Sequence, residues 1–153
     1  MGHLFTYLTA AFACLATSAA AEGPNRLSVL LGSHHLNAKQ SFEQTNPGLF
    51  LDWVRPDGVT VSFGGYRNSF GKPSIAAMAG LKLFESERTR IDLFGGVAHY
   101  PGDGRKNRFA IGDLTPLVGL RAEHRGLFVL ALPGDGQATD AIFGFGLSMD
   151  LPR

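Results

Sequence analysis

The chain is poor in cysteine and in net charge. Cys14 is the only cysteine among 153 residues, and it lies in the N-terminal segment. A chain without a second cysteine has no internal disulfide and no multi-thiolate metal site. Lys and Arg total 14 while Asp and Glu total 13, so no positive excess points to nucleic acid. We expect neither disulfides nor a nucleic-acid partner.

An apolar run occupies the N-terminal segment and ends in Ser18-Ala19-Ala20-Ala21. Small residues after a short apolar run are typical of a signal-peptidase site. An uncleaved anchor is the alternative, but the run is too short to cross a bilayer. We predict that residues 1–21 are a secretory signal and that residues 22–153 form one domain. Export without disulfides suggests the envelope of a Gram-negative bacterium.

No long helical period and no internal repeat occurs in the rest of the chain, whereas glycine is abundant, with 20 residues. Prolines sit at segment ends, which together with the glycines favours β structure with tight turns. Alternation of period two predicts eight strands. They span residues 27–36, 48–55, 59–67, 74–84, 89–100, 114–124, 127–133 and 139–151.

The final run alternates large apolar residues, such as Phe143 and Phe145, with small ones, such as Gly144 and Gly146. A transmembrane barrel with lipid outside has this pattern, and so does a soluble barrel with an apolar interior. Short connections alternate with longer ones along the chain, as in outer-membrane barrels. We predict an all-β, eight-stranded antiparallel up-and-down transmembrane β-barrel with its longer loops at the outer end.

This order of strands predicts that several polar residues meet at the outer rim. His34 and His35 end the first upward run, and Asn68 and Ser69 follow the second. Strict alternation would aim His34 inward and His35 at lipid, so an inward His35 requires a bulge near Ser33. Asn and Ser are also ordinary loop residues, and a purely structural turn is the alternative interpretation.

Several short motifs resemble one family in their order and spacing. They are Ser33-His34-His35-Leu36-Asn37, Phe42-Glu43-Gln44-Thr45-Asn46-Pro47-Gly48, Asn68-Ser69-Phe70 with Lys72, Leu114-Thr115-Pro116-Leu117 and Leu132-Pro133-Gly134. In these motifs and in its alternating final strand, the chain resembles the PagP-type lipid A palmitoyltransferases and their small-barrel relatives.

The resemblance implies an eight-stranded outer-membrane barrel that moves a palmitoyl chain from a glycerophospholipid to lipid A. The family uses a histidine and an adjacent Asp-Ser pair, which by position correspond to His35 and to Asn68-Ser69 in this chain. Asparagine cannot ionise, so Asn68 cannot act as a base. It can still orient His35 or donate to an oxyanion.

The resemblance also places the wall of the acyl pocket at Gly80, which shares a strand face with Met78. The alternative interpretation is that Gly80 has no role in substrate binding and only relieves crowding inside the barrel. We expect His34, Met78 and Gly80 to contact substrate.

Three cationic residues in a long loop suit lipid A phosphates, although a solvated loop explains them too. They are Arg105, Lys106 and Arg108.

Arg121 and Glu123 share a face near a tight turn, and we expect them to pair with Asp150 or Asp92 inside the barrel. No cluster of His and carboxylates has metal-ligand spacing, and we expect neither metal nor cofactor.

The hypothesis is therefore an outer-membrane acyltransferase, monomeric, acting on phospholipid and lipid A. The alternatives are a non-catalytic envelope or lipid-binding barrel and a soluble lipid carrier.

Overall fold

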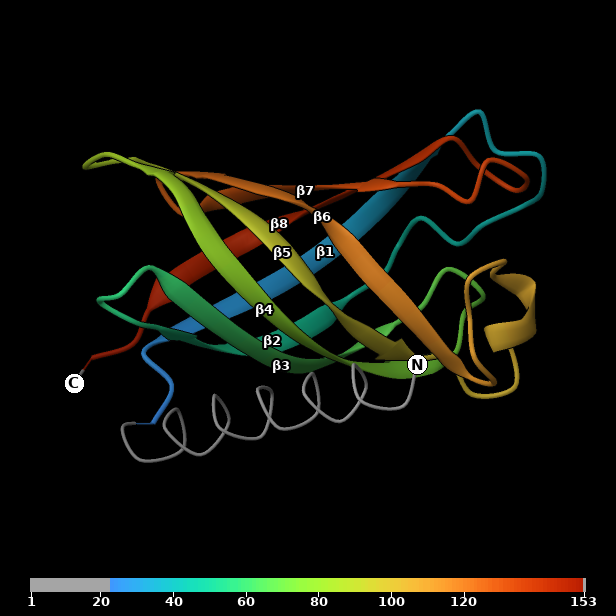
Figure 1. Ribbon diagram of the computed structural model, residues 1–153, viewed down its shortest axis with the longest axis horizontal. Helices are drawn as coiled ribbons and strands as arrows, with labels where there is room; N and C mark the ends of the chain where they lie inside the picture. The colour runs from blue at the N-terminus through green and yellow to red at the C-terminus, as the bar shows by residue number, and fades with distance from the viewer. Residues whose placement is uncertain (1–22, 153) are drawn as a thin grey trace, which may run out of the picture.

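The structure, a computed structural model, describes residues 23–152 as one closed antiparallel β-barrel in which each strand pairs with its neighbours in sequence (Figure 1). Pairing of the first strand with the last closes the wall. The predicted eight-stranded up-and-down barrel is confirmed. The strands are β1 (Arg26–Leu36), β2 (Gly48–Val54), β3 (Val59–Arg67), β4 (Pro73–Glu85), β5 (Thr89–His99), β6 (Leu114–His124), β7 (Leu127–Pro133) and β8 (Ala141–Asp150).

The two ends of the barrel differ in their connections, as the sequence predicts. The turns at residues 55–58, 86–88 and 125–126 lie at one end, and the longer loops lie at the other, here called the rim (Figure 1). The loop at residues 100–113 carries the short 3₁₀ helix η1 (Gly104–Lys106). Among the described residues, no helix has the length and apolar character needed to cross a membrane. The predicted signal at residues 1–21 lies outside the described part of the chain.

Large apolar side chains cover the outside of the barrel, whereas the lumen holds small and polar residues together with a cluster of apolar side chains in its middle. On β8, Phe143, Phe145, Leu147 and Met149 are exposed. The glycines between them are buried. The same outward distribution occurs on other strands, for example at Leu49, Phe63, Ile75, Leu81, Leu93, Val97, Val118 and Val129. The alternation allows the large apolar residues to face either the lumen or the outer surface, and in the structure most of them face the outer surface.

Aromatic rings that do point inward lie over glycines of the neighbouring strand. Phe50 is opposite Gly64, and a Cβ added at Gly64 would come within 2.6 Å of the phenyl ring. Phe128 is opposite Gly146, where an added Cβ would meet that ring at 2.5 Å. The missing side chain gives each ring room in a lumen that is narrow in an eight-stranded barrel.

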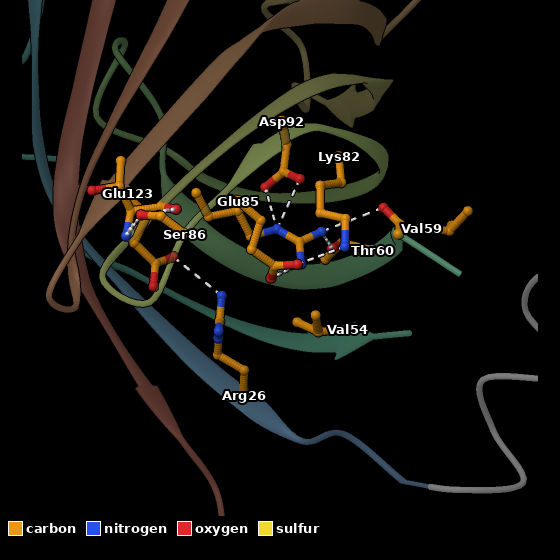
Figure 2. A network of polar contacts seen from close by, with 12 residues as sticks. Arg26, Val54, Val59, Thr60, Lys82, Glu85, Ser86, Asp92 and Glu123 are labelled. Carbon is orange, nitrogen blue, oxygen red and sulfur yellow. Dashed lines mark hydrogen bonds and ion pairs between the residues drawn. The ribbon is translucent and has the colours of Figure 1, made fainter. Parts of the chain in front are cut away.

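Ion pairs fill the lumen at the end with the short turns (Figure 2). Arg90 has a side chain only 8% exposed, and its Nε donates to both oxygens of Asp92 at 2.9 Å. Its remaining nitrogens reach Glu85 Oε1 at 3.4 Å and Thr60 Oγ1 at 3.0 Å. Because each partner comes from a different part of the wall, the guanidinium links β3, β4 and β5.

Arg121 belongs to a second group of charges at this end. Its Nη2 lies 3.0 Å from Glu123 Oε2, and its Nη1 lies 3.7 Å from Asp52 Oδ2. The predicted pairing of Arg121 with Asp150 or Asp92 is therefore wrong, and its partner is Asp52. Asp150 pairs with Arg26, and Asp92 pairs with Arg90. The reason is geometric, because β2 brings Asp52 across the lumen from β6.

This charged layer forms the floor of the lumen. Arg26 joins the second group through Glu123 at 3.2 Å (Figure 2). The guanidinium carbon of Arg121 lies 4.4 Å from the centre of the Phe128 ring, where the polar floor meets the apolar middle of the barrel. Buried charges are tolerated when they are paired, so the floor depends on its complete set of partners.

Arg90→Ala tests this dependence. The substitution leaves the buried Asp92 without its cation, and we expect the free energy of unfolding to fall by about 3–5 kcal/mol. Urea titration of the purified protein measures the change. Arg90→Met combined with Asp92→Leu removes both charges and should cost much less. Equal losses for the single and double variants would contradict the role of the ion pair.

Candidate functional site

A bulge in β1 turns His35 into the barrel. The register against β8 shifts between Leu30 and Gly32, so one residue of β1 has no opposite partner. Beyond the shift, Ser33 and His35 are buried, with 7% and 5% exposure, and His34 is exposed. The bulge that an inward His35 requires is present near Ser33. His34, which we expect to contact substrate, is exposed on the outer face.

His35 is held by an aromatic ring and lacks a polar partner. Its ring stacks on Phe42 with centroids 4.1 Å apart and planes inclined by 10°. Its Nδ1 is buried and makes no hydrogen bond within residues 23–152. A buried polar atom without a protein partner is costly, and a catalytic role or a bound water or ion can account for such an atom. His35 is therefore positioned by packing, and its side chain borders the rim cavity.

The segment at residues 43–47 fills the wall between the outer half of β1 and the turn after β3. The backbone N–H of Ser33 donates to Gln44 O at 2.8 Å, and that of Glu43 donates to Ser69 O at 2.9 Å. Asn46, only 2% exposed, lies within this segment and accepts a hydrogen bond from Ser33 Oγ at 2.5 Å. The segment thus joins the His35 strand to the Ser69 turn.

Asn68 organises the turn that carries Ser69. It is fully buried, and its Oδ1 accepts hydrogen bonds from the N–H groups of Phe70 at 2.9 Å and Lys72 at 3.1 Å. Its Nδ2 donates to Ser74 Oγ at 2.9 Å. In the described chain no hydrogen bond joins Asn68 to His35. The amide is occupied by the turn, so it supports the site by shaping the backbone.

Ser69 lies where two cavities of the barrel meet. The inner cavity, of about 140 Å³, occupies the middle of the lumen and is lined by apolar residues that include Leu30, Phe50, Met78, Phe94, Phe128 and Leu130. The rim cavity, of about 350 Å³, is lined by residues that include His35, Phe42, Phe70, Lys106, Arg108 and Pro133. Ser69 and Tyr100 line both, as do Leu117, Leu132 and Ile142, so the two cavities adjoin at these residues.

Ser69 is half-buried, and its hydroxyl forms no hydrogen bond within residues 23–152, to His35 or to any other group. Gly80 and Met78 both line the inner cavity, as the strand face predicts. An added Cβ at Gly80 would lie 3.7 Å from Asp92 Cβ, an ordinary contact, so the glycine is not demanded by backbone crowding. The structure places Met78 and Gly80 in the inner cavity and His35 in the rim cavity, with Ser69 lining both.

The rim cavity reaches the outside between β6 and β7. These strands pair only from Leu120 opposite Ala131 to His124 opposite Leu127. Above that level the cavity is lined by both inward and outward residues of β6, including Leu117 and Val118. Pro116 and Pro133 border it as well, and proline has no N–H to offer a neighbouring strand. The wall therefore has a lateral opening at its outer end.

The cationic residues of the loop at residues 100–113 have different surroundings. Lys106 pairs with Asp103 at 2.8 Å and lies 4.4 Å from the Phe70 ring centre. Arg108 lines the rim cavity with its guanidinium over Phe109, and Arg105 is exposed on η1. Lys106 and Arg108 thus border the rim cavity, whereas Arg105 does not line it.

Sequence reasoning gave no individual role to three residues of the site, which are Phe42, Asn46 and Tyr100. Phe42 and Asn46 occur in a motif that carries the family resemblance, and that motif is the signal by which the sequence points to them. Among the described residues, no group of three or more His, Cys, Asp or Glu side chains is placed to hold a metal ion.

Asn68→Ala should destabilise the protein by about 2 kcal/mol, because it leaves the N–H groups of Phe70 and Lys72 without their acceptor. Asn68→Asp keeps an acceptor at the same place and should cost less than half as much. Chemical denaturation of both variants measures the difference. Equal losses would mean that the turn does not depend on this acceptor.

Asp103 attaches the long loop to the rim and gives it a pH dependence. Its side chain is 4% exposed and binds Lys106 and, at 2.9 Å, Lys72. These hydrogen bonds, first from Lys106 and then from Lys72, hold the pKa of Asp103 below its ordinary value. A carboxyl with a lowered folded-state pKa stabilises the fold above its unfolded pKa of about 3.9 and loses this effect as pH falls through the folded value.

We expect the loop to stay attached at neutral pH, to weaken below about pH 4 and to detach as pH falls through the lowered folded-state pKa of Asp103. Amide protection factors of residues 100–113, measured by hydrogen exchange, follow this change. Asp103→Asn should lower the protection at neutral pH and remove its dependence on acid. Protection that is unaltered in Asp103→Asn would refute the attachment.

Comparison of the chain with protein-family models finds no match, and comparison with curated proteins finds none either. The arguments about its function therefore rest on the geometry of the rim and the lumen.

Proposed function

We propose that this chain is an outer-membrane acyltransferase that moves a fatty acyl chain from a glycerophospholipid to lipid A. One observation carries the proposal: an apolar cavity, closed below by ion pairs, adjoins at Ser69 a rim cavity that His35 lines and that opens between β6 and β7. A lipid chain entering sideways would place its alkyl part in the apolar cavity. Its ester would then stop at the polar residues of the rim.

The membrane location is supported by the outer surface. Large apolar residues are exposed around the barrel, and contiguous apolar surface of this kind is unfavourable in water. Closed barrels satisfy their backbone groups within the wall, which a bilayer requires. In this arrangement the short turns face the periplasm and the rim faces the cell exterior, where lipid A resides. The closed barrel has no edge strand, and the unpaired lengths of β6 and β7 are confined to the rim, so we expect a monomer.

The chemistry that fits the site has two acyl-transfer steps. Ser69 Oγ attacks the ester carbonyl of the phospholipid and gives its proton to His35. The ester C–O bond breaks, the released lysophospholipid oxygen takes that proton, and the acyl group is left on Ser69. A lipid A hydroxyl then attacks the acyl-serine carbonyl. Its proton passes through His35 to Ser69 Oγ as the acyl C–O bond breaks.

His35, Asn68 and the two cations beside the rim cavity can each be given a role in this acyl transfer. His35 is fixed by Phe42 and has a free ring nitrogen. The hydrogen bond between His35 and Ser69 would form in the lipid complex, since catalytic hydrogen bonds often tighten only when substrate is bound. Asn68 holds the Ser69 turn. Lys106 and Arg108, beside the rim cavity, would meet the phosphates of the lipid headgroups.

A non-catalytic lipid-binding barrel is the second candidate. The engaged amide of Asn68 and the separate His35 and Ser69 side chains favour it, because no acid orients the histidine. Its cavity would hold a lipid in the same way, without turnover. Analysis of the lipid product separates the two candidates.

Mass spectrometry of lipid A from a Gram-negative host with and without the protein tests the enzyme. We expect lipid A with one additional fatty acyl chain, absent in Ser69→Ala and in His35→Ala. Ser41→Ala removes the same hydroxyl from an exposed loop position and should retain activity. An unchanged acylation pattern in cells that contain the folded barrel would refute the enzyme and leave the lipid-binding candidate.

A further inference from the structure

The side-chain amide nitrogen of Asn46 is buried and has no hydrogen-bond acceptor in the neighbouring turn or in the barrel wall. The residue is 2% exposed, and its Nδ2 makes no hydrogen bond within residues 23–152. Leaving a buried donor unsatisfied costs about 1–3 kcal/mol. Other buried atoms without hydrogen-bond partners in the described chain belong to ion-paired aspartates, to Trp53 near a short turn and to His35. Asn46 is the amide donor among them.

The orientation of this amide is fixed before any ligand arrives. Ser33 Oγ donates to Asn46 Oδ1 at 2.5 Å, which leaves Nδ2 as the free end of the side chain. The backbone on either side is also tied, because Gln44 O accepts from Ser33 N and Pro47 O accepts from Arg67 N at 2.9 Å. A donor held in this way needs no reorganisation when negative charge develops near it.

Asn46 and His35 line different cavities that share Ser69. Asn46 lines the inner cavity, His35 lines the rim cavity, and Ser69 lines both. An ester carbonyl beside Ser69 would therefore have a base on the rim side and an amide donor on the lumen side. Acyl transfer needs this combination, since the carbonyl oxygen becomes an anion in the tetrahedral intermediate.

We propose that Asn46 Nδ2 donates a hydrogen bond to the carbonyl oxygen of the fatty acyl ester and stabilises its oxyanion. This role rests on the proposed function, and it makes Asn46 a catalytic residue. No covalent bond to Asn46 forms or breaks: its hydrogen bond to the carbonyl oxygen strengthens as Ser69 attacks and weakens when the carbonyl is restored. The ligand class is thus a fatty acyl ester, and an ether lipid would lack the acceptor.

Acyl transfer by Asn46→Asp tests the donor, because aspartate keeps the size and the acceptor oxygen and loses the N–H groups. We expect kcat to fall about 10²- to 10³-fold while KM for the phospholipid changes little. Ser33→Ala frees the amide to rotate and should lower kcat by a smaller factor. Thr45→Ala, an exposed neighbour on the same segment, serves as the control and should match the parent protein. A kcat for Asn46→Asp within threefold of the parent overturns the proposal.

Ligand binding provides a measurement that is independent of turnover. A long-chain fatty acid methyl ester and the matching alkyl methyl ether are titrated into the detergent-solubilised barrel. The parent protein should bind the ester more tightly, and Asn46→Asp should bind both alike. Equal binding of ester and ether by the parent protein overturns the role of Asn46 without the use of any variant.

The two measurements separate the two proposals. If the parent protein transfers no acyl group but prefers the ester through Asn46, the proposed enzyme is wrong and the carbonyl site stands. If the parent protein transfers acyl groups and Asn46→Asp does so equally well, the enzyme stands and the role of Asn46 is wrong.

Discussion

Closure of the wall by the pairing of β1 with β8 is the constraint on which the rest of the structure depends. It gives every strand two neighbours, so the backbone groups of the wall find partners within it. The period of two then assigns each side chain to the lumen or to the surface. Because eight strands enclose little space, bulky residues collect outside. The rings that remain inside, such as Phe50 and Phe128, lie over glycines.

The lumen is divided along its length by charge. Arg90, Arg121 and Arg26 need partners once they are buried, and the carboxylates that satisfy them gather at the end with the short turns. The middle of the barrel is left apolar and free of unpaired charge. A lipid tail binds best among apolar side chains, whereas its ester needs polar groups nearby. The apolar inner cavity suits the tail, and the polar residues of the rim suit the ester.

The candidate site arises where regular strand pairing fails at the rim. The bulge in β1 turns His35 inward, the segment at residues 43–47 replaces a missing length of β2, and the pairing of β6 with β7 stops short. A barrel with regular pairing along every strand would have none of these features: an inward His35, a buried Asn46 beside the lumen, or an opening between β6 and β7. The proposed chemistry uses all of them: a base, an amide donor and a way in for lipid.

The sequence by itself determined the eight strands, their order and the faces of Met78 and Gly80, because alternation and turn residues act over a few positions and need no distant partner. It also predicted that the segments of His35 and Ser69 meet at one rim. Only the tertiary structure decided where the bulge falls, which carboxylate faces Arg121 and what surrounds Asn46. Those outcomes depend on strands distant in sequence, whose register is set when the barrel closes.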